Sequence, residues 1–264
     1  MNTPPLLRDL PSQFEPLSPF LESNLQPYIK IHVEEEVKWL ESDWNGDPLE
    51  FCQSKVGGHP YLPKGTRYPS DRQTNEMMMF LMQVNCADLP IIDRFPLPRQ
   101  GILQFYSGLN VSMCTLSPER HRILYFPEII QDTNELVTDF SFLADSASDW
   151  EGYECIYPLT FSAQHDVFWS SREQLDEPLE IPDELAQLGE EFDEWIADYE
   201  FDQVRQRENK LGGYVELHSE VGEVLEGAKG RLLLEFNHEF NSDDHFYFFI
   251  EDIDLANLDF RIVD

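Results

Sequence analysis

Apolar residues occur mainly in short runs that are separated by prolines, glycines and acidic residues. Four such runs lie at 77–85, 101–109, 121–129 and 157–162, and each is too short for an ordinary helix. Turn-forming residues bound them, which is typical of strands. Residues 27–33, PYIKIHV, alternate apolar and polar positions, as expected of a strand with one buried face. The chain is therefore predicted to be rich in β-structure.

Residues 183–208 follow a different pattern, which predicts a helix that begins after Pro182. Their apolar positions recur every three or four residues, at Leu185, Leu188, Phe192, Trp195, Ile196 and Tyr199. We expect this apolar stripe to face the core. The opposite face carries the carboxylates Glu190, Glu191, Asp193, Glu194, Asp198, Glu200 and Asp202, with no Lys or Arg between 173 and 202. That face is either a solvated helix surface or a surface that binds a protein partner.

A three-part pattern occurs twice along the chain. Each copy has Lys-x-Gly-Gly, a variable loop, an apolar strand that ends in Gln-x-Asn or Glu-x-Asn, and an aromatic strand. The copies lie at 55–58, 80–85 and 102–107, and at 210–213, 232–237 and 246–251. Because three blocks match in the same order, we interpret them as two related β units, an internal pseudo-repeat. The two glycines are expected to form a bend in each unit, since glycine adopts positive φ freely.

The predicted fold is α+β, a β-rich single domain built from two related β units with a few peripheral helices. The units span about 55–160 and 210–264, and the acidic helical segment at about 172–208 joins them. The whole domain covers 28–264. The proline-rich residues 1–27 are predicted to form a lead-in segment laid across the core.

Several blocks of the sequence resemble the bacterial YwqG-like proteins, a domain family of unknown function. They are SKVGGHPYLPKGTRYP, MMMFLMQVNCADLP, LPRQGILQFYSG, NKLGGYVE, GRLLLEFN and HFYFFIEDIDLANLDF. The resemblance covers roughly residues 28–264 and implies the fold of that family, but it implies no particular reaction. Two loops depart from the family pattern. Residues 237–245 replace a Trp-Gly-Asp-x-Gly-like turn, and residues 214–223 also differ.

The charge of the chain narrows the classes of partner. There are 51 acidic and 18 basic residues, which gives a formal net charge of −33. Such a field opposes binding to nucleic acid phosphates and to anionic membranes, and it favours a basic protein partner or serves solubility alone. The N-terminus lacks the pattern of a secretory signal and no long apolar run is present, so we expect a cytoplasmic protein. The four cysteines form no Cys-x-x-Cys pair and are expected to be buried, reduced thiols.

Common catalytic motifs are absent from the chain. Neither a nucleophile elbow, a phosphate-binding P-loop nor a dinucleotide-binding glycine pattern occurs, so we assign no catalytic residue and expect no cofactor. Ligand-binding candidates are the polar residues of the two repeats, Lys55, His59, Gln83, Asn85, Gln104, Lys210, Glu235 and Asn237. The lysines beside Gly-Gly could neutralise an anion, whereas the amides could instead hold neighbouring backbone. If a ligand site exists, we expect it in the seam between the units.

The sequence HEFNSDDH is a possible metal-binding cluster. Its candidate ligands are His238, Asp243, Asp244 and His245, since imidazole and carboxylate groups bind divalent metals. The Asn, Ser and Asp residues between the histidines favour a turn between two strands as the first interpretation.

The leading functional hypothesis is a non-catalytic, acidic protein-binding module that recognises a basic partner. An immunity-type protein that occludes a basic toxin is one concrete version. The alternative is a small-molecule or metal-binding protein or enzyme with its site in the seam. A third interpretation is a scaffold whose charge serves only solubility. The sequence does not indicate an oligomeric state.

Overall fold

Strands dominate the computed structural model, which describes residues 4–38, 47–108, 120–144, 155–168, 172–173, 181–203, 209–216, 229–237 and 245–260. Within these residues, nine strands form one antiparallel sheet in the order β12-β11-β9-β1-β7-β3-β4-β5-β6. Their bounds are β1 (Gln26–Val33), β3 (Lys55–Val56), β4 (Met79–Asn85), β5 (Ile102–Ser107), β6 (His121–Phe126), β7 (Cys155–Asp166), β9 (Lys210–Gly212), β11 (Arg231–Asn237) and β12 (His245–Ile250). The short β2 (Val37–Lys38) adds to β7, and β8 (Arg172–Glu173) pairs with β10 (Val215–Glu216).

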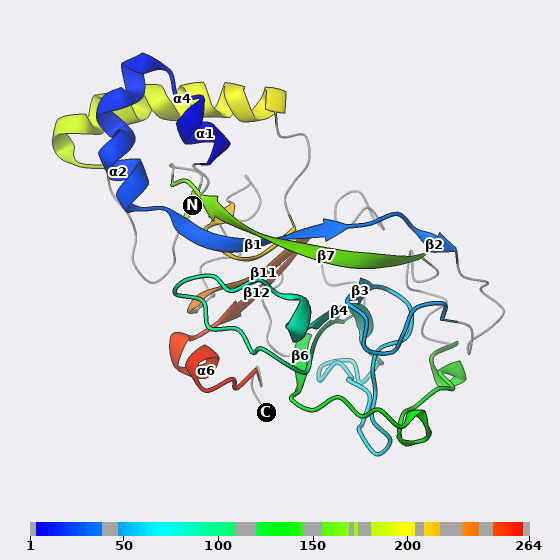
Figure 1. Ribbon diagram of the computed structural model, residues 1–264. Helices are drawn as coiled ribbons and strands as arrows, with labels where there is room; N and C mark the ends of the chain where they lie inside the picture. The colour runs from blue at the N-terminus through cyan, green and yellow to red at the C-terminus, as the bar shows by residue number, and fades with distance from the viewer. Residues whose placement is uncertain are drawn as a thin grey trace.

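The prediction of a β-rich single domain is confirmed, and the four apolar runs and the alternating segment 27–33 all contribute strands. Residues 77–85 supply β4, and residues 27–33 lie in β1, where Ile29 and Ile31 are buried. The last run, 157–162, is the middle of a longer strand, because β7 extends through polar residues to Asp166. β1 and β7 pair along eight residues at the centre of the sheet (Figure 1).

The sheet curls until its two ends nearly meet. The ring centroid of Phe248 on β12 lies 5.1 Å from that of Phe105 on β5 and 5.1 Å from that of His121 on β6. Apolar residues from both halves fill the interior as one core, including Val84, Leu103, Leu233 and Phe236. The strand order places β1 and β7 at the centre, with β9, β11 and β12 on one side and β3, β4, β5 and β6 on the other. That the two β units are related stays a prediction.

A helical layer lies to one side of the sheet (Figure 1). It contains α1 (Pro5–Arg8), η1 (Ser12–Leu17), α2 (Ser18–Ser23), η5 (Asp183–Leu185) and α4 (Ala186–Gln203). The predicted helix is thus confirmed over 183–203, and residues 204–208 lie outside the described part. Phe192 and Ile196 of α4 pack against Phe14 and Leu17, and the Phe14 and Phe192 rings are 5.5 Å apart. The lead-in segment therefore forms a second core with α4 instead of crossing the main one.

Short helices complete the described chain. They are η2 (Cys86–Asp88), η3 (Thr133–Glu135), η4 (Ser141–Leu143) and α6 (Asp252–Ala256). No helix in the described ranges is long and apolar enough to cross a membrane.

Candidate functional site

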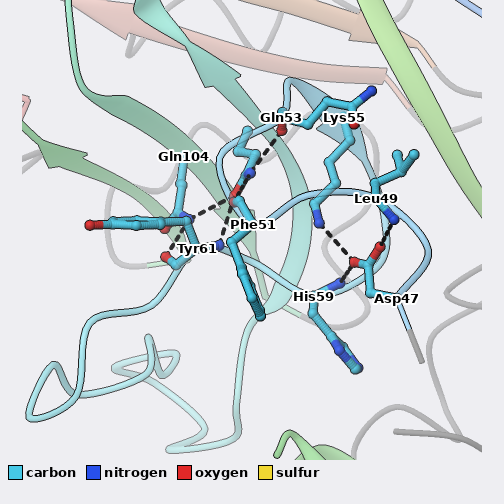
Figure 2. Close-up of polar contacts among 9 residues, drawn as sticks. Asp47, Leu49, Phe51, Gln53, Lys55, His59, Tyr61 and Gln104 are labelled. Atoms are coloured by element: carbon cyan, nitrogen blue, oxygen red, sulfur yellow. Dashed lines mark hydrogen bonds and ion pairs between the residues drawn. The ribbon is translucent and has the colours of Figure 1, made fainter. Parts of the chain in front are cut away.

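The first Lys-x-Gly-Gly forms a buried ion pair, which we call the Lys55 joint (Asp47, Lys55, Gly57, Gly58 and His59). The Lys55 side chain is 1% exposed, and its Nζ lies 2.7 Å from Asp47 Oδ2. The same carboxylate oxygen accepts the His59 backbone N–H at 2.7 Å (Figure 2). Asp47 Oδ1 accepts the Leu49 N–H at 2.9 Å. One carboxylate therefore fixes both the lysine and the chain beyond the glycines.

The two glycines are required by the space that this arrangement leaves. Both have φ of +68°, a left-handed conformation that other residues adopt at a cost. A Cβ on Gly57 would lie 2.2 Å from the Cys155 carbonyl oxygen, and a Cβ on Gly58 would lie 2.6 Å from Asp47 Oδ2. Both positions therefore require glycine, because a side chain would collide with the Cys155 carbonyl or with the Asp47 carboxylate.

The second Lys-x-Gly-Gly builds the same geometry, which we call the Lys210 joint (Asp166, Lys210, Gly212, Gly213 and Tyr214). Lys210 Nζ lies 2.9 Å from Asp166 Oδ2, and this oxygen accepts the Tyr214 N–H at 3.1 Å. The two glycines again have positive φ, +76° and +82°. A Cβ on Gly213 would lie 2.3 Å from Asp166 Oδ2.

The two joints differ in the residue that faces the lysine across the sheet. Lys55 is paired with Gln83 of β4, whereas Lys210 is paired with Glu235 of β11. Glu235 Oε2 lies 3.7 Å from Lys210 Nζ, and both side chains are buried. Burial lowers the pKa of Lys55, although the neighbouring Asp47 carboxylate acts in the opposite direction. An external anion would have to compete with these internal carboxylates for either lysine.

The predicted amide residues hold backbone. Gln83 Oε1 accepts the Tyr61 N–H at 2.8 Å, and its Nε2 donates to the carbonyl oxygens of Phe51 (2.7 Å) and Gln53 (2.8 Å) (Figure 2). Gln104 Nε2 donates to the Tyr61 carbonyl at 2.7 Å and to Gln83 Oε1 at 3.1 Å. The segment 51–61 is thus tied to β4 and β5 by two buried side chains.

The remaining ligand candidates lie around these groups. Asn85 Nδ2 donates to the Cys52 carbonyl at 3.1 Å, and its Oδ1 accepts the Ala87 N–H. Asn237 is half-buried at the end of β11, and its N–H donates to Asn209 Oδ1 at 2.7 Å. The His59 ring is buried and stacks on Phe140, with centroids 4.5 Å apart.

The sheet does not gather all candidates into one place. Gln83 lies on β4 and Glu235 on β11, and β3, β7, β1 and β9 separate these strands in the sheet. The candidates form two groups, one at each joint. Between β5 and β12, the rings of Phe105 and Phe248 pack together in the interior. Binding of a ligand by these residues stays a prediction.

The acidic face of α4 is partly described. Glu190, Glu191 and Glu194 are exposed and Asp193 is half-buried, whereas Phe192 is buried. Asp198, Glu200 and Asp202 lie within α4, but their side chains are outside the described part. The helix therefore presents carboxylates on the side opposite its packed stripe.

The predicted metal cluster falls outside the described residues. His238, Asp243 and Asp244 are not described, and His245 is described only in its backbone, as the first residue of β12. Among the described residues, no group of three or more His, Cys, Asp or Glu side chains could hold a metal ion. The metal site at 238–245 stays a prediction.

The cysteine prediction can be followed for three of the four residues. Cys86 is buried, and burial raises its pKa to about 12, so it is an unreactive thiol at neutral pH. Cys52 and Cys155 are half-buried thiols. Cys114 lies outside the described residues.

A third ion pair joins a half-buried arginine to a buried carboxylate, and neither residue lies in a motif named above. Arg120 Nε lies 2.8 Å from Asp71 Oδ2, while Asp71 Oδ1 accepts the N–H groups of Gln73 and Thr74. Burial alone would raise the pKa of Asp71. The Arg120 hydrogen bond and the two backbone N–H groups outweigh that effect and lower the pKa below its usual value.

The two carboxylates that complete the joints were not predicted from the sequence. Asp47 precedes Lys55 by eight residues, whereas Asp166 precedes Lys210 by 44, so no common spacing identifies them. A physical signal was available, because a lysine inside a buried strand requires a partner of opposite charge. That requirement does not say which of the 51 acidic residues supplies it.

Comparison with known proteins gives a family assignment. A search of curated proteins found no match. The family model described as "Domain of unknown function (DUF1963)" matches residues 54–263. The match includes both Lys-x-Gly-Gly segments and begins after Asp47. The chain therefore belongs to the DUF1963 family, a domain family of unknown function.

Proposed function

We propose that the chain is a non-catalytic protein-binding module whose acidic α4 face recognises a basic protein partner. The observation that carries the proposal is the row of exposed carboxylates Glu190, Glu191 and Glu194, on a helix without Lys or Arg. Phe192 and Ile196 anchor this helix against the lead-in segment, so the carboxylates are held on a packed support.

Electrostatics favour this kind of recognition. Clustered like charges steer an oppositely charged partner, and they raise association rate and selectivity more than affinity. The net charge of −33 gives the whole molecule a negative electrostatic potential that also attracts a basic partner. An immunity-type protein that occludes a basic toxin remains the most concrete version.

The joints support a structural role for the polar residues inside the sheet. Both lysines are paired with carboxylates, and Gln83 and Gln104 hold backbone groups. We further propose that the two β units arose by duplication, because the joints share one geometry. We also propose that the chain is a YwqG-like member of the DUF1963 family.

The test compares two variants with the same change of charge. E190K/E191K reverses two exposed charges on α4, and E35K/E36K reverses two exposed charges after β1. Wild type and the two variants are immobilised, and the capture of basic proteins by each is measured at low and high salt. We expect wild type and E35K/E36K to capture the same salt-sensitive partner and E190K/E191K to lose at least tenfold in affinity. Equal retention by all three chains would contradict the proposal.

A further inference from the structure

Three exposed apolar side chains lie on two neighbouring segments at one end of the sheet, the loop after η2 and α6 with the turn that follows it, and we call them the Ile91 surface (Ile91, Ile253 and Leu258). Ile91 is 79% exposed, Ile253 is 64% exposed and Leu258 is 39% exposed. They are three of the four strongly exposed large apolar residues in the described ranges, and the fourth is Phe142. Scattered exposed apolar residues are ordinary, whereas a group of them indicates a contact surface.

Arg231 shows that the two segments of this surface are neighbours. Its Nη1 donates to the Arg94 carbonyl oxygen at 2.5 Å, and its Nε forms an ion pair with Asp252 at the start of α6. The loop and α6 also bury Phe95 and Leu255 in the same core. In Figure 1, α6 lies at the end of the sheet next to β11 and β12. The exposed side chains are therefore carried by segments that are fixed to each other.

The backbone at Leu258 is held in an unfavourable conformation. Asp259 N–H donates to the Asp254 carbonyl at 2.8 Å, and Leu258 N–H donates to the Leu255 carbonyl at 3.0 Å. These two bonds form a Schellman motif, in which the position of Leu258 is normally occupied by glycine. Leu258 adopts φ of +52° there. A leucine in this left-handed conformation lowers the stability of the fold. Its side chain is nevertheless partly exposed to solvent.

Arg94 repeats this strain on the loop. Its φ is +61°, so two of the three non-glycine residues with positive φ in the described chain lie on the segments that carry the Ile91 surface. Non-glycine residues in this conformation are uncommon, and they concentrate where function requires a particular shape. The strain and the exposed apolar side chains thus occur together.

We propose that the Ile91 surface docks a protein segment that carries apolar anchors and a basic flank. The basic flank follows from charge, since Glu251, Asp254 and Asp259 lie on the α6 side in addition to Asp252, which Arg231 already pairs, and no Lys or Arg occurs between 251 and 260. Arg94 and Arg99 lie on the loop side, so the basic flank faces α6. This surface is separate from α4 and does not depend on the function proposed above.

The same charge argues against two other occupants. A second copy of the chain would bring two bodies of charge −33 together, and an anionic bilayer would also be repelled. A basic, amphipathic protein segment meets the apolar residues and the carboxylates at once. The occupant is therefore a basic protein segment.

The test uses a fluorescein-labelled synthetic helical peptide of Leu and Lys with one apolar face. Its comparison peptide has every Leu replaced by Ser. Binding is measured by fluorescence anisotropy to wild type, I91S/I253S and L258G. The control variants are F142S, which removes the exposed apolar residue outside the surface, and E190K/E191K on α4.

We expect I91S/I253S and L258G to weaken binding of the Leu/Lys peptide at least tenfold and the controls to change it less than threefold. The Tm of L258G should be unchanged within about 2 °C or higher, because relief of left-handed strain offsets the lost contacts. Three results would overturn the proposal: no binding of the Leu/Lys peptide, equal binding of the Ser/Lys peptide, or loss only in E190K/E191K. Sedimentation of wild type as a dimer that I91S/I253S converts to monomer would assign the surface to self-association and overturn it too.

Discussion

The Lys55 joint and the Lys210 joint share a turn. They differ in the number of carboxylates near the lysine and in the distance along the chain from which the paired carboxylate comes. Lys55 meets one carboxylate, Asp47, and faces the neutral Gln83. Lys210 lies near two carboxylates, Asp166 at 2.9 Å and Glu235 at 3.7 Å. The shared part is a buried carboxylate oxygen that lies 2.6 Å (Lys55 joint) or 2.3 Å (Lys210 joint) from the place that a Cβ on the second glycine would take. The second carboxylate is an addition that this turn does not need.

The two carboxylates also come from different distances along the chain. Asp47 lies eight residues before Lys55, so the first joint closes a local loop. Asp166 ends β7 and lies 44 residues before Lys210, so the second joint connects strands on either side of β1. Loss of the Lys210 joint should therefore affect the sheet as a whole, and loss of the Lys55 joint mainly the loop beside it.

The largest expected effect comes from removing either lysine. K210M leaves Asp166 and Glu235 buried together, whereas K55M leaves only Asp47. Breaking a buried ion pair typically costs about 3–5 kcal/mol, and we expect K210M to cost more than K55M. Urea unfolding monitored by circular dichroism measures both. A larger loss in K55M than in K210M would contradict the expected effect of the second carboxylate.

A reciprocal exchange tests the difference between Gln83 and Glu235. Q83E removes the donor that serves the Phe51 and Gln53 carbonyls, and we expect it to cost about 2–4 kcal/mol. E235Q removes one of two buried carboxylates and should cost less than about 1 kcal/mol. The same unfolding measurement compares them. Equal losses would mean that the two positions are interchangeable.

The glycines allow a smaller test of the same comparison. A Cβ in G57A would meet the Cys155 carbonyl oxygen at 2.2 Å, whereas a Cβ in G212A would meet the Phe95 ring at 3.2 Å. Both substitutions carry left-handed strain of about 1–2 kcal/mol, but a ring can shift more easily than a backbone carbonyl. We expect G57A to lower Tm more than G212A in thermal unfolding. The reverse order would show that β7 yields at Cys155.

The third ion pair serves as a reference without Lys-x-Gly-Gly. D71N removes the charge that accepts hydrogen bonds from Arg120, Gln73 and Thr74, and we expect a loss of about 1–2 kcal/mol at pH 7. Because folding lowers the pKa of Asp71, its contribution is complete above the ordinary Asp pKa of about 4 and is lost as pH falls through the folded value. The Tm values of wild type and D71N should therefore converge below about pH 4. A constant difference from pH 7 to pH 2 would rule out this linkage.

Periodicity predicted the elements well because burial follows it closely. The run at 80–85 is apolar because β4 is almost wholly buried, and the stripe at Phe192 and Ile196 is buried as helical spacing requires. Periodicity says which face is buried but not against what. It therefore did not show that α4 packs on the lead-in helices.

The candidate site was predicted only in part, for a different reason. Lys-x-Gly-Gly was visible as a joint because it occurs twice, and both copies have positive φ. Asp47 and Asp166 were invisible because tertiary contacts, not local spacing, bring them to the lysines. Leu258 was also missed, since nothing in the letters LANLD shows that its backbone is left-handed.

The place of β1 in the sheet has a consequence for synthesis on the ribosome. Lys30 of β1 is paired with Lys210 of β9, so one neighbour of this central strand is made 180 residues later. At about 5–20 residues per second, β1 waits on the order of 10–40 s for that neighbour. A nascent chain must therefore keep the apolar face of its first strand from aggregating for most of its own translation.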